Sequence, residues 1–163
     1  MNGRDPFPSL VVRPVGPDDA DCVRRLLERV SPESIYRRFF TLFPSPPARV
    51  VRQLTDVDHA DHEGLAVLDG DETVALASWD RPAHAVAEAE IAVLVDDAWQ
   101  HMGLGGALVR MLSGDAARHG IAVLNATVLS DNHPARQLAT KVGHPASVVL
   151  DGPETLYTFS LAS

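Results

Sequence analysis

The residues best suited to chemistry form a glycine-rich turn, Gln100-His101-Met102-Gly103-Leu104-Gly105-Gly106, between an apolar run and a helical pattern. Glycine lets the backbone approach a ligand closely, because no side chain stands in the way. The helix expected from Leu104 begins with free N–H groups and the positive end of its dipole. Together these features predict a binding site for a pyrophosphate.

Two common phosphate-binding motifs do not fit this turn. A P-loop needs Gly-Lys-Ser/Thr, and the turn contains no lysine. A dinucleotide fingerprint needs a third glycine where this chain has Leu108. What remains is the pattern Gln-x-x-Gly-x-Gly, carried by Gln100, Gly103 and Gly105.

Two carboxylates begin the apolar run that precedes the turn. Glu88 and Glu90 share one face of the strand expected over 88–95, because side chains alternate along a strand. A carboxylate at the edge of a buried strand can act as a general base, although it can equally be a strand-end salt bridge. We favour Glu90 as the base and keep Glu88 as its competitor.

The elements that position these residues follow from hydrophobic periodicity. Strands are expected over 10–15, 64–68, 73–79, 88–95, 121–128, 148–150 and 156–161, and helices over 17–30, 32–40, 48–54, 104–117 and 134–142. The strand at 88–95, the following helix and the strand at 121–128 form a β-α-β unit, so the two strands should be parallel. The last two strands should pair antiparallel.

A second motif lies on the helix expected from residue 134. It reads Asn132-x-x-Ala135-x-x-Leu138, followed by Lys141-Val142-Gly143. With the Gln-x-x-Gly-x-Gly turn and the order of elements, it resembles the GNAT superfamily of N-acyltransferases over residues 10–161. The resemblance implies an α/β (α+β) fold: a mixed, mostly antiparallel sheet of six to seven strands flanked by helices, with a parallel central β-α-β pair.

The resemblance also implies acetyl-CoA as cosubstrate, with the pyrophosphate on the glycine turn. Its pantetheine arm would pair with the strand at 93–95, where the two parallel strands separate. Asn132 would touch the same arm, or would simply cap its helix, and His101 would take the place of an arginine found in relatives. The implied contacts are Val93, Leu94, Val95, Gln100, His101, Met102, Gly103, Leu104, Gly105, Gly106 and Asn132.

The implied reaction is direct acetyl transfer to a primary amine. An amine with a pKa of about 10.4 must lose a proton before it attacks, whereas a thiol with a pKa of about 8.5 leaves readily. A base therefore matters more than an acid, and this chain has Ala139 where relatives often carry an acidic tyrosine. It also has His144 where relatives carry phenylalanine. These departures keep an alternative open, a non-catalytic acyl-CoA-binding or sensing domain.

The acceptor amine is less defined. Residues 31–40 look like the corresponding helix of bacterial Pat-type protein-lysine acetyltransferases, so the resemblance implies a protein lysine, and a small amine is the alternative. Four aromatic residues would line the acceptor side or belong to the core: Tyr36, Phe39, Phe40 and Trp79.

Composition limits the other possibilities. The 163 residues suit a single domain, and a net charge of −8 argues against nucleic-acid binding. No apolar run could span a membrane and no signal-peptide core is present, so we expect a cytoplasmic protein. The lone Cys22 and the scattered histidines, including His59 and His62 in an acidic loop, predict no metal site. Residues 1–9 look like a flexible end, and a homodimer is one alternative for the oligomeric state.

Overall fold

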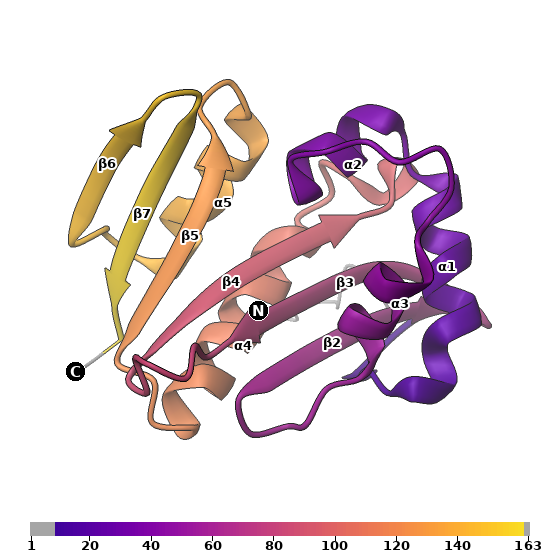
Figure 1. The fold of residues 1–163 in the computed structure, drawn as a ribbon, viewed down its shortest axis with the longest axis horizontal. Helices are drawn as coiled ribbons and strands as arrows, with labels where there is room; N and C mark the ends of the chain where they lie inside the picture. Colours follow the sequence, from indigo (N-terminus) through magenta and orange to yellow (C-terminus); the bar gives the residue numbers. More distant parts are fainter. Residues whose placement is uncertain (1–8, 162–163) are drawn as a thin grey trace, which may run out of the picture.

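A seven-stranded mixed sheet forms the centre of the molecule (Figure 1). The computed structural model describes residues 9–161, so all but Ser9 of the expected flexible end lies outside the described residues. The strands are β1 (Leu10–Pro14), β2 (His62–Asp69), β3 (Glu72–Asp80), β4 (Glu88–Val95), β5 (Val123–Leu129), β6 (Ser147–Asp151) and β7 (Glu154–Ser160). Their order across the sheet is β1-β2-β3-β4-β5-β7-β6, and only β4 and β5 pair in parallel.

Five α-helices and two short 3-10 helices flank the sheet. They are η1 (Pro17–Asp19), α1 (Ala20–Arg29), α2 (Pro32–Phe39), α3 (Ala48–Thr55), η2 (Asp97–Trp99), α4 (Leu104–Arg118) and α5 (His133–Val142). The predicted fold class is confirmed, with a mostly antiparallel sheet and a central parallel pair. Among residues 9–161, none of the helices combines the length and the hydropathy that a membrane span requires.

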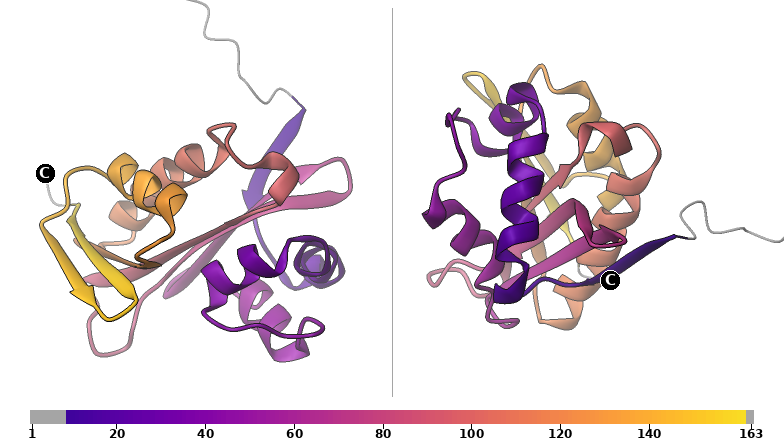
Figure 2. Two further views of the ribbon diagram at one scale, coloured as in Figure 1. Left: turned by 90° about the horizontal axis from the view of Figure 1, so that it is seen from above. Right: turned by 90° about the vertical axis from the view of Figure 1, so that its right-hand side faces the viewer.

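The helices lie in two layers, one on each face of the sheet (Figure 2). On one face, α1, α2 and α3 pack against β2, β3 and β4 through a cluster that includes Leu26, Ile35, Val50 and Leu76. On the other face, α4 and α5 cover β3, β4, β5 and β7 through a larger cluster around the buried Leu108. Because both faces of β3 are covered, seven consecutive residues of that strand are buried.

The fifth strand starts later than its apolar pattern predicts. Ile121 is buried in the core, yet its backbone N–H donates to the carbonyl of Ala116 in the last turn of α4, and β5 begins only at Val123. The apolar pattern at Ile121 therefore indicates a buried side chain and not a residue paired in the strand. The short helix η2, between β4 and the glycine turn, was not predicted from the sequence.

Candidate active site

The two parallel strands at the centre of the sheet separate at Glu90. β4 and β5 pair only through Glu88 with Val123, Ala89 with Leu124 and Glu90 with Asn125. Beyond this point β4 continues to pair with β3 and β5 with β7, so the two strands diverge like the arms of a V in Figure 1. The edge of β4 over residues 93–95 has no strand partner on the β5 side, as the sequence predicts.

Gln100 lies at the open end of this gap. Its side-chain amide donates to the Val95 carbonyl oxygen at 2.9 Å and to the Ser34 hydroxyl at 3.2 Å. The N–H and C=O groups of alternate residues point to the same edge of a strand, so those of Val93 face the gap as the Val95 carbonyl does. Gln100 thus satisfies one backbone group at the gap and leaves the Val93 groups free for a ligand.

Helix α2 is fixed beside the end of β4 by its own N-cap. The Asp97 carboxylate accepts from the backbone N–H of Ser31 at 2.9 Å and from its hydroxyl at 2.8 Å. Burial raises the pKa of Asp97, but the hydrogen bonds from Ser31 and Ser34 outweigh it and leave the pKa below its ordinary value. The carboxylate therefore stays charged and holds α2 over this end of the sheet.

The glycine turn leads into the start of α4, with residues 101–103 exposed, Gly105 half-buried and Gly106 buried. Gly103 is the N-cap residue at a φ of 88°, and a Cβ there would meet nothing within 4 Å. His101 also has a positive φ of 63°, which is uncommon for a residue with a side chain. Met102 is exposed, whereas Leu104 is buried in the core. The first N–H groups of α4, which have no carbonyl partner one turn earlier, are thus open to an anion.

The other two glycines allow neighbouring groups to approach α4. A Cβ on Gly105 would lie 3.1 Å from a Leu138 methyl group of α5, so this glycine permits close packing of the two helices. At Gly106 a Cβ would lie 3.6 Å from Lys141 Cγ and 3.7 Å from an Arg110 guanidinium nitrogen. Two cationic side chains therefore lie beside the first turns of α4. Lys141 comes beside Gly106 only when α5 packs on α4, so its position could not be predicted from the sequence. Arg110 lies four residues after Gly106 on the same helix, so helical spacing could have found it.

Glu88 and Glu90 lie on the same exposed face of β4, as strand alternation predicts. Glu88 accepts a hydrogen bond from the Asn125 side-chain amide at 3.1 Å. Glu90 is the last residue of β4 paired with β5, so its side chain stands where the gap begins. Within residues 9–161 the Glu90 carboxylate makes no side-chain hydrogen bond or ion pair, and it is free to act on a ligand.

Charged groups that the sequence analysis missed surround Glu90. Asp80 lies opposite Glu90 across the β3–β4 pairing, and its carboxylate is 3.2 Å from His62 Nε2. Burial raises the pKa of Asp80. Burial also lowers the pKa of the Arg38 guanidinium on α2, against the opposing effect of the nearby Asp80 and Glu90 carboxylates. The register of β3 on β4 creates this cluster, and no local pattern encodes that register.

The four aromatic candidates separate into two groups. Trp79 is fully buried on the α4 face, where its indole N–H donates to Asp115 at 2.9 Å, so it cannot line an acceptor site on the Glu90 face. Phe39 packs against Phe43 with ring centroids 5.6 Å apart. Tyr36 and Phe40 remain exposed on and just after α2, and they are the members of this set that an acceptor could still touch.

Asn132 and Ala139 both have structural roles on α5. The Asn132 side-chain oxygen accepts from the backbone N–H of Ala135 at 3.2 Å, which confirms the expected helix cap. A contact between Asn132 and a ligand stays a prediction. Ala139 is the buried residue of α5 and packs in the core, and its methyl side chain cannot act as an acid.

Comparison with known proteins identifies this arrangement. The model of the acetyltransferase (GNAT) family matches residues 30–144. Acetyltransferase Pat of Mycolicibacterium smegmatis is 32% identical over 134 residues, which are 81% of this chain and only 40% of that protein.

Solved structures agree with the sequence match. The crystal structure of the GNAT domain of S. lividans PAT superimposes with a TM-score of 0.84 at 34% identity, over 91% of this chain and 89% of that one. The structure of yncA from Salmonella typhimurium with its cofactor acetyl-CoA shares the fold at a TM-score of 0.71 and 17% identity, over 94% of this chain and 95% of that one. The chain therefore belongs to the GNAT family of acetyltransferases.

Proposed function

We propose that the protein is an acetyl-CoA-dependent N-acetyltransferase that moves an acetyl group directly to a primary amine, with Glu90 as general base. The observation that carries this proposal is the gap between β4 and β5. It opens at Glu90 and has free backbone groups at Val93. The β4 edge leads through Gln100 to the glycine-rich start of α4.

The cosubstrate fits this site in two parts. The pyrophosphate would accept hydrogen bonds from the first N–H groups of α4, with Lys141 and Arg110 beside them to offset its charge. These cations matter because the chain carries a net charge of −8, which would otherwise repel an anion. The pantetheine arm would lie in the gap and pair with the Val93 backbone like an added strand.

The reaction then needs one proton acceptor. An alkyl ammonium has a pKa of about 10.4 and cannot attack until Glu90 removes a proton. The free amine attacks the thioester carbonyl carbon and a C–N bond forms. The nitrogen then gives its second proton to water, and the C–S bond breaks to release the CoA thiolate. Because a thiol has a pKa of about 8.5, the thiolate leaves without a protein acid and takes its proton from water. The alanine at position 139 is compatible with this chemistry.

The acceptor we favour is a protein lysine. The carboxylates of Asp80, Glu88 and Glu90 gather on one face and suit an incoming ammonium group. Residues 31–40 resemble the equivalent helix of Pat-type enzymes, and two of the similar proteins are named Pat. Since the chain spans only 40% of the Mycolicibacterium protein, that protein's properties do not decide the acceptor here. A small amine is the alternative, and a cytoplasmic location and a homodimer stay predictions.

A second candidate function is a non-catalytic acyl-CoA-binding domain. The observation that favours it is Ala139, a buried alanine at the position where relatives often carry an acid. Both candidates bind acetyl-CoA, so binding does not separate them, whereas turnover does.

The test is release of free thiol from acetyl-CoA in the presence of lysine peptides and small amines. We expect thiol release that depends on the acceptor, with mass spectrometry showing one acetyl group on the amine. Saturable acetyl-CoA binding without turnover on any acceptor would contradict the enzyme and support the binding domain. Thiol release that is the same with and without amine would show hydrolysis instead of transfer.

A further inference from the structure

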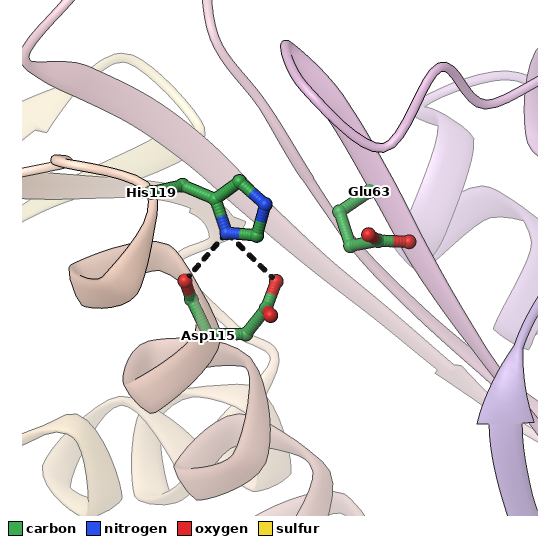
Figure 3. Close-up of side chains that lie close together, drawn as sticks. All are labelled: Glu63, Asp115 and His119. Atoms are coloured by element: carbon green, nitrogen blue, oxygen red, sulfur yellow. Dashed lines mark hydrogen bonds and ion pairs between the residues drawn. The ribbon is translucent and has the colours of Figure 1, made fainter.

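A cluster of potential metal ligands lies at the opposite end of α4 from the glycine turn (Figure 3). Glu63 comes from the start of β2, Asp115 from the last turn of α4, and His119 is the residue that ends this helix. One ligand atom from each lies within 4.8 Å of the other two. These residues are far apart in the sequence and follow no metal-binding motif, which explains why the sequence predicted no metal site.

We propose that Glu63, Asp115 and His119 bind one divalent transition-metal ion of the zinc type. The first support is the orientation of the imidazole. His119 Nδ1 lies 2.9 Å from the Asp115 carbonyl oxygen and 3.6 Å from its carboxylate. Figure 3 shows the other ring nitrogen on the side that faces Glu63. A metal-binding histidine usually donates its second ring N–H to a carbonyl or carboxylate in this way.

The carboxylates are held from outside the cluster as well. The Asp115 carboxylate accepts from the Trp79 indole N–H at 2.9 Å, and Trp79 is fully buried. Glu63 accepts from the backbone N–H of Gly64 at 2.9 Å and lies 2.8 Å from His59 Nδ1. Only one Glu63 oxygen takes part in these two contacts, so the other is available to a metal. Each proposed ligand is thus oriented by a neighbour, as in built metal sites.

Charge supports the same conclusion. The Glu63 side chain is only 9% exposed, and among the described residues its one potential ion-pair partner is His59, with no arginine or lysine paired to it. Arg118 reaches Asp115 at 3.3 Å but is 71% exposed. Arg81 donates to the His119 carbonyl oxygen, and the carboxylate with which it forms an ion pair, at 3.6 Å, is that of Asp61 and not that of Glu63 or Asp115. Two carboxylates this close suit a divalent cation, because buried charges are normally paired or coordinate metals.

The ligand set selects the class of metal. One imidazole with two carboxylates suits Zn²⁺ or Co²⁺ better than Mg²⁺ or Ca²⁺, which prefer oxygen ligands alone. Helix α4 has 15 residues, and at 1.5 Å per residue it separates the cluster from the glycine turn by about 22 Å. The metal would therefore tie β2 to the end of α4 and would take no part in acetyl transfer.

The experiment is titration of the chelator-treated full chain with Zn²⁺ by calorimetry, and with Co²⁺ by visible absorption. We expect one Zn²⁺ per chain and a rise in Tm, because a metal that binds only the folded state stabilises it. Glu63→Gln, Asp115→Asn and His119→Gln should each lose this binding. His144→Gln, which changes an exposed histidine far from the cluster in the sequence, should keep it.

Two results would overturn the proposal: no saturable binding by the wild-type chain, or binding that survives all three ligand substitutions. Circular dichroism of the metal-free variants checks that they fold. A measurement on the wild type needs no variant: bound Co²⁺ should shift the NMR signals of the His119 ring protons, and unshifted signals on Co²⁺ binding would place the metal elsewhere.

Discussion

At the scale of single residues, two properties make Glu90 the proposed base: its position at the end of the β4–β5 pairing and its carboxylate without a hydrogen-bond partner among the described residues. It is the last residue of β4 paired with β5, and its carboxylate makes no hydrogen bond within the part of the chain described here. Glu88, on the same face, is already engaged by Asn125. The two carboxylates therefore form a matched pair for mutation, one free and one occupied.

We predict that Glu90→Gln slows acetyl transfer by about 10²–10⁴-fold near neutral pH, since general base catalysis typically contributes that much. Acetyl-CoA affinity should be nearly unchanged, and raising the pH should partly restore the rate because free amine then forms without the base. Glu88→Gln is the control and should be mild. A pH–rate series on both variants checks this prediction. A large loss of rate for Glu88→Gln with none for Glu90→Gln would show that Glu88, and not Glu90, is the base.

Lys141 offers a second prediction at this scale. Its side chain lies beside Gly106 in the first turn of α4, so we expect it to contact a phosphate. Hydrogen bonds to charged groups contribute about 1.5–3 kcal/mol, so Lys141→Met should weaken acetyl-CoA binding by roughly tenfold or more. Arg118→Met, which removes an exposed cation at the other end of α4, serves as the control. Calorimetry at low and high salt measures the acetyl-CoA affinity of both variants. Equal losses of affinity in the two would mean a non-specific charge effect and would contradict a contact between Lys141 and the phosphate.

At the scale of elements, the contact between α4 and α5 depends on one glycine. A Cβ on Gly105 would press on Leu138 at 3.1 Å, whereas one on Gly114 would meet only the exposed Arg118 at 3.6 Å. Gly105→Val should cost about 1–3 kcal/mol of unfolding free energy through overpacking. Gly114→Val should stay within about 0.5 kcal/mol of the wild type, as surface changes usually do. Urea unfolding measures both, and indistinguishable midpoints would contradict this packing.

The loop before β2 makes a prediction about pH. Asp58 accepts from the backbone N–H groups of Ala60, Asp61 and His62, and the first of these contributes most to a pKa of about 2. An unfolded aspartate titrates near 3.9. Because the folded pKa is the lower one, this carboxylate stabilises the fold above about pH 4, and the effect is lost as the pH falls toward about 2. Asp58→Asn should therefore be less stable than wild type at neutral pH and equal to it near pH 2, by urea unfolding. A difference independent of pH would contradict the assignment.

At the scale of the whole molecule, local sequence patterns predict the helices and strands but not the tertiary contacts between them. The bounds of β4 were predicted to the residue, because an apolar run between charged residues and a glycine turn has clear ends. The cap at Asn132 was also predictable, because it follows from a motif within a few residues, whereas the opening of β4 from β5 was expected from the family resemblance.

Contacts between distant segments could not be predicted in this way. Asp80 meets Glu90 only through the β3–β4 register, and Arg38 reaches them only after α2 has packed over the sheet. The ligand cluster that joins β2 to the end of α4 depends on the same tertiary arrangement. Such pairings are set by loop lengths and by the packing of both faces, which one sequence does not display.

The proposed function requires acetyl-CoA to bind in the gap between β4 and β5 and against the start of α4. Amide hydrogen exchange with and without acetyl-CoA tests it most directly, with NAD as the control ligand. We expect slower exchange at Val93 and at Leu104, Gly105 and Gly106 with acetyl-CoA, and no change at these amides with NAD. Protection confined to other residues, such as those of the open groove lined by Arg25, Glu28 and Trp99, would contradict it.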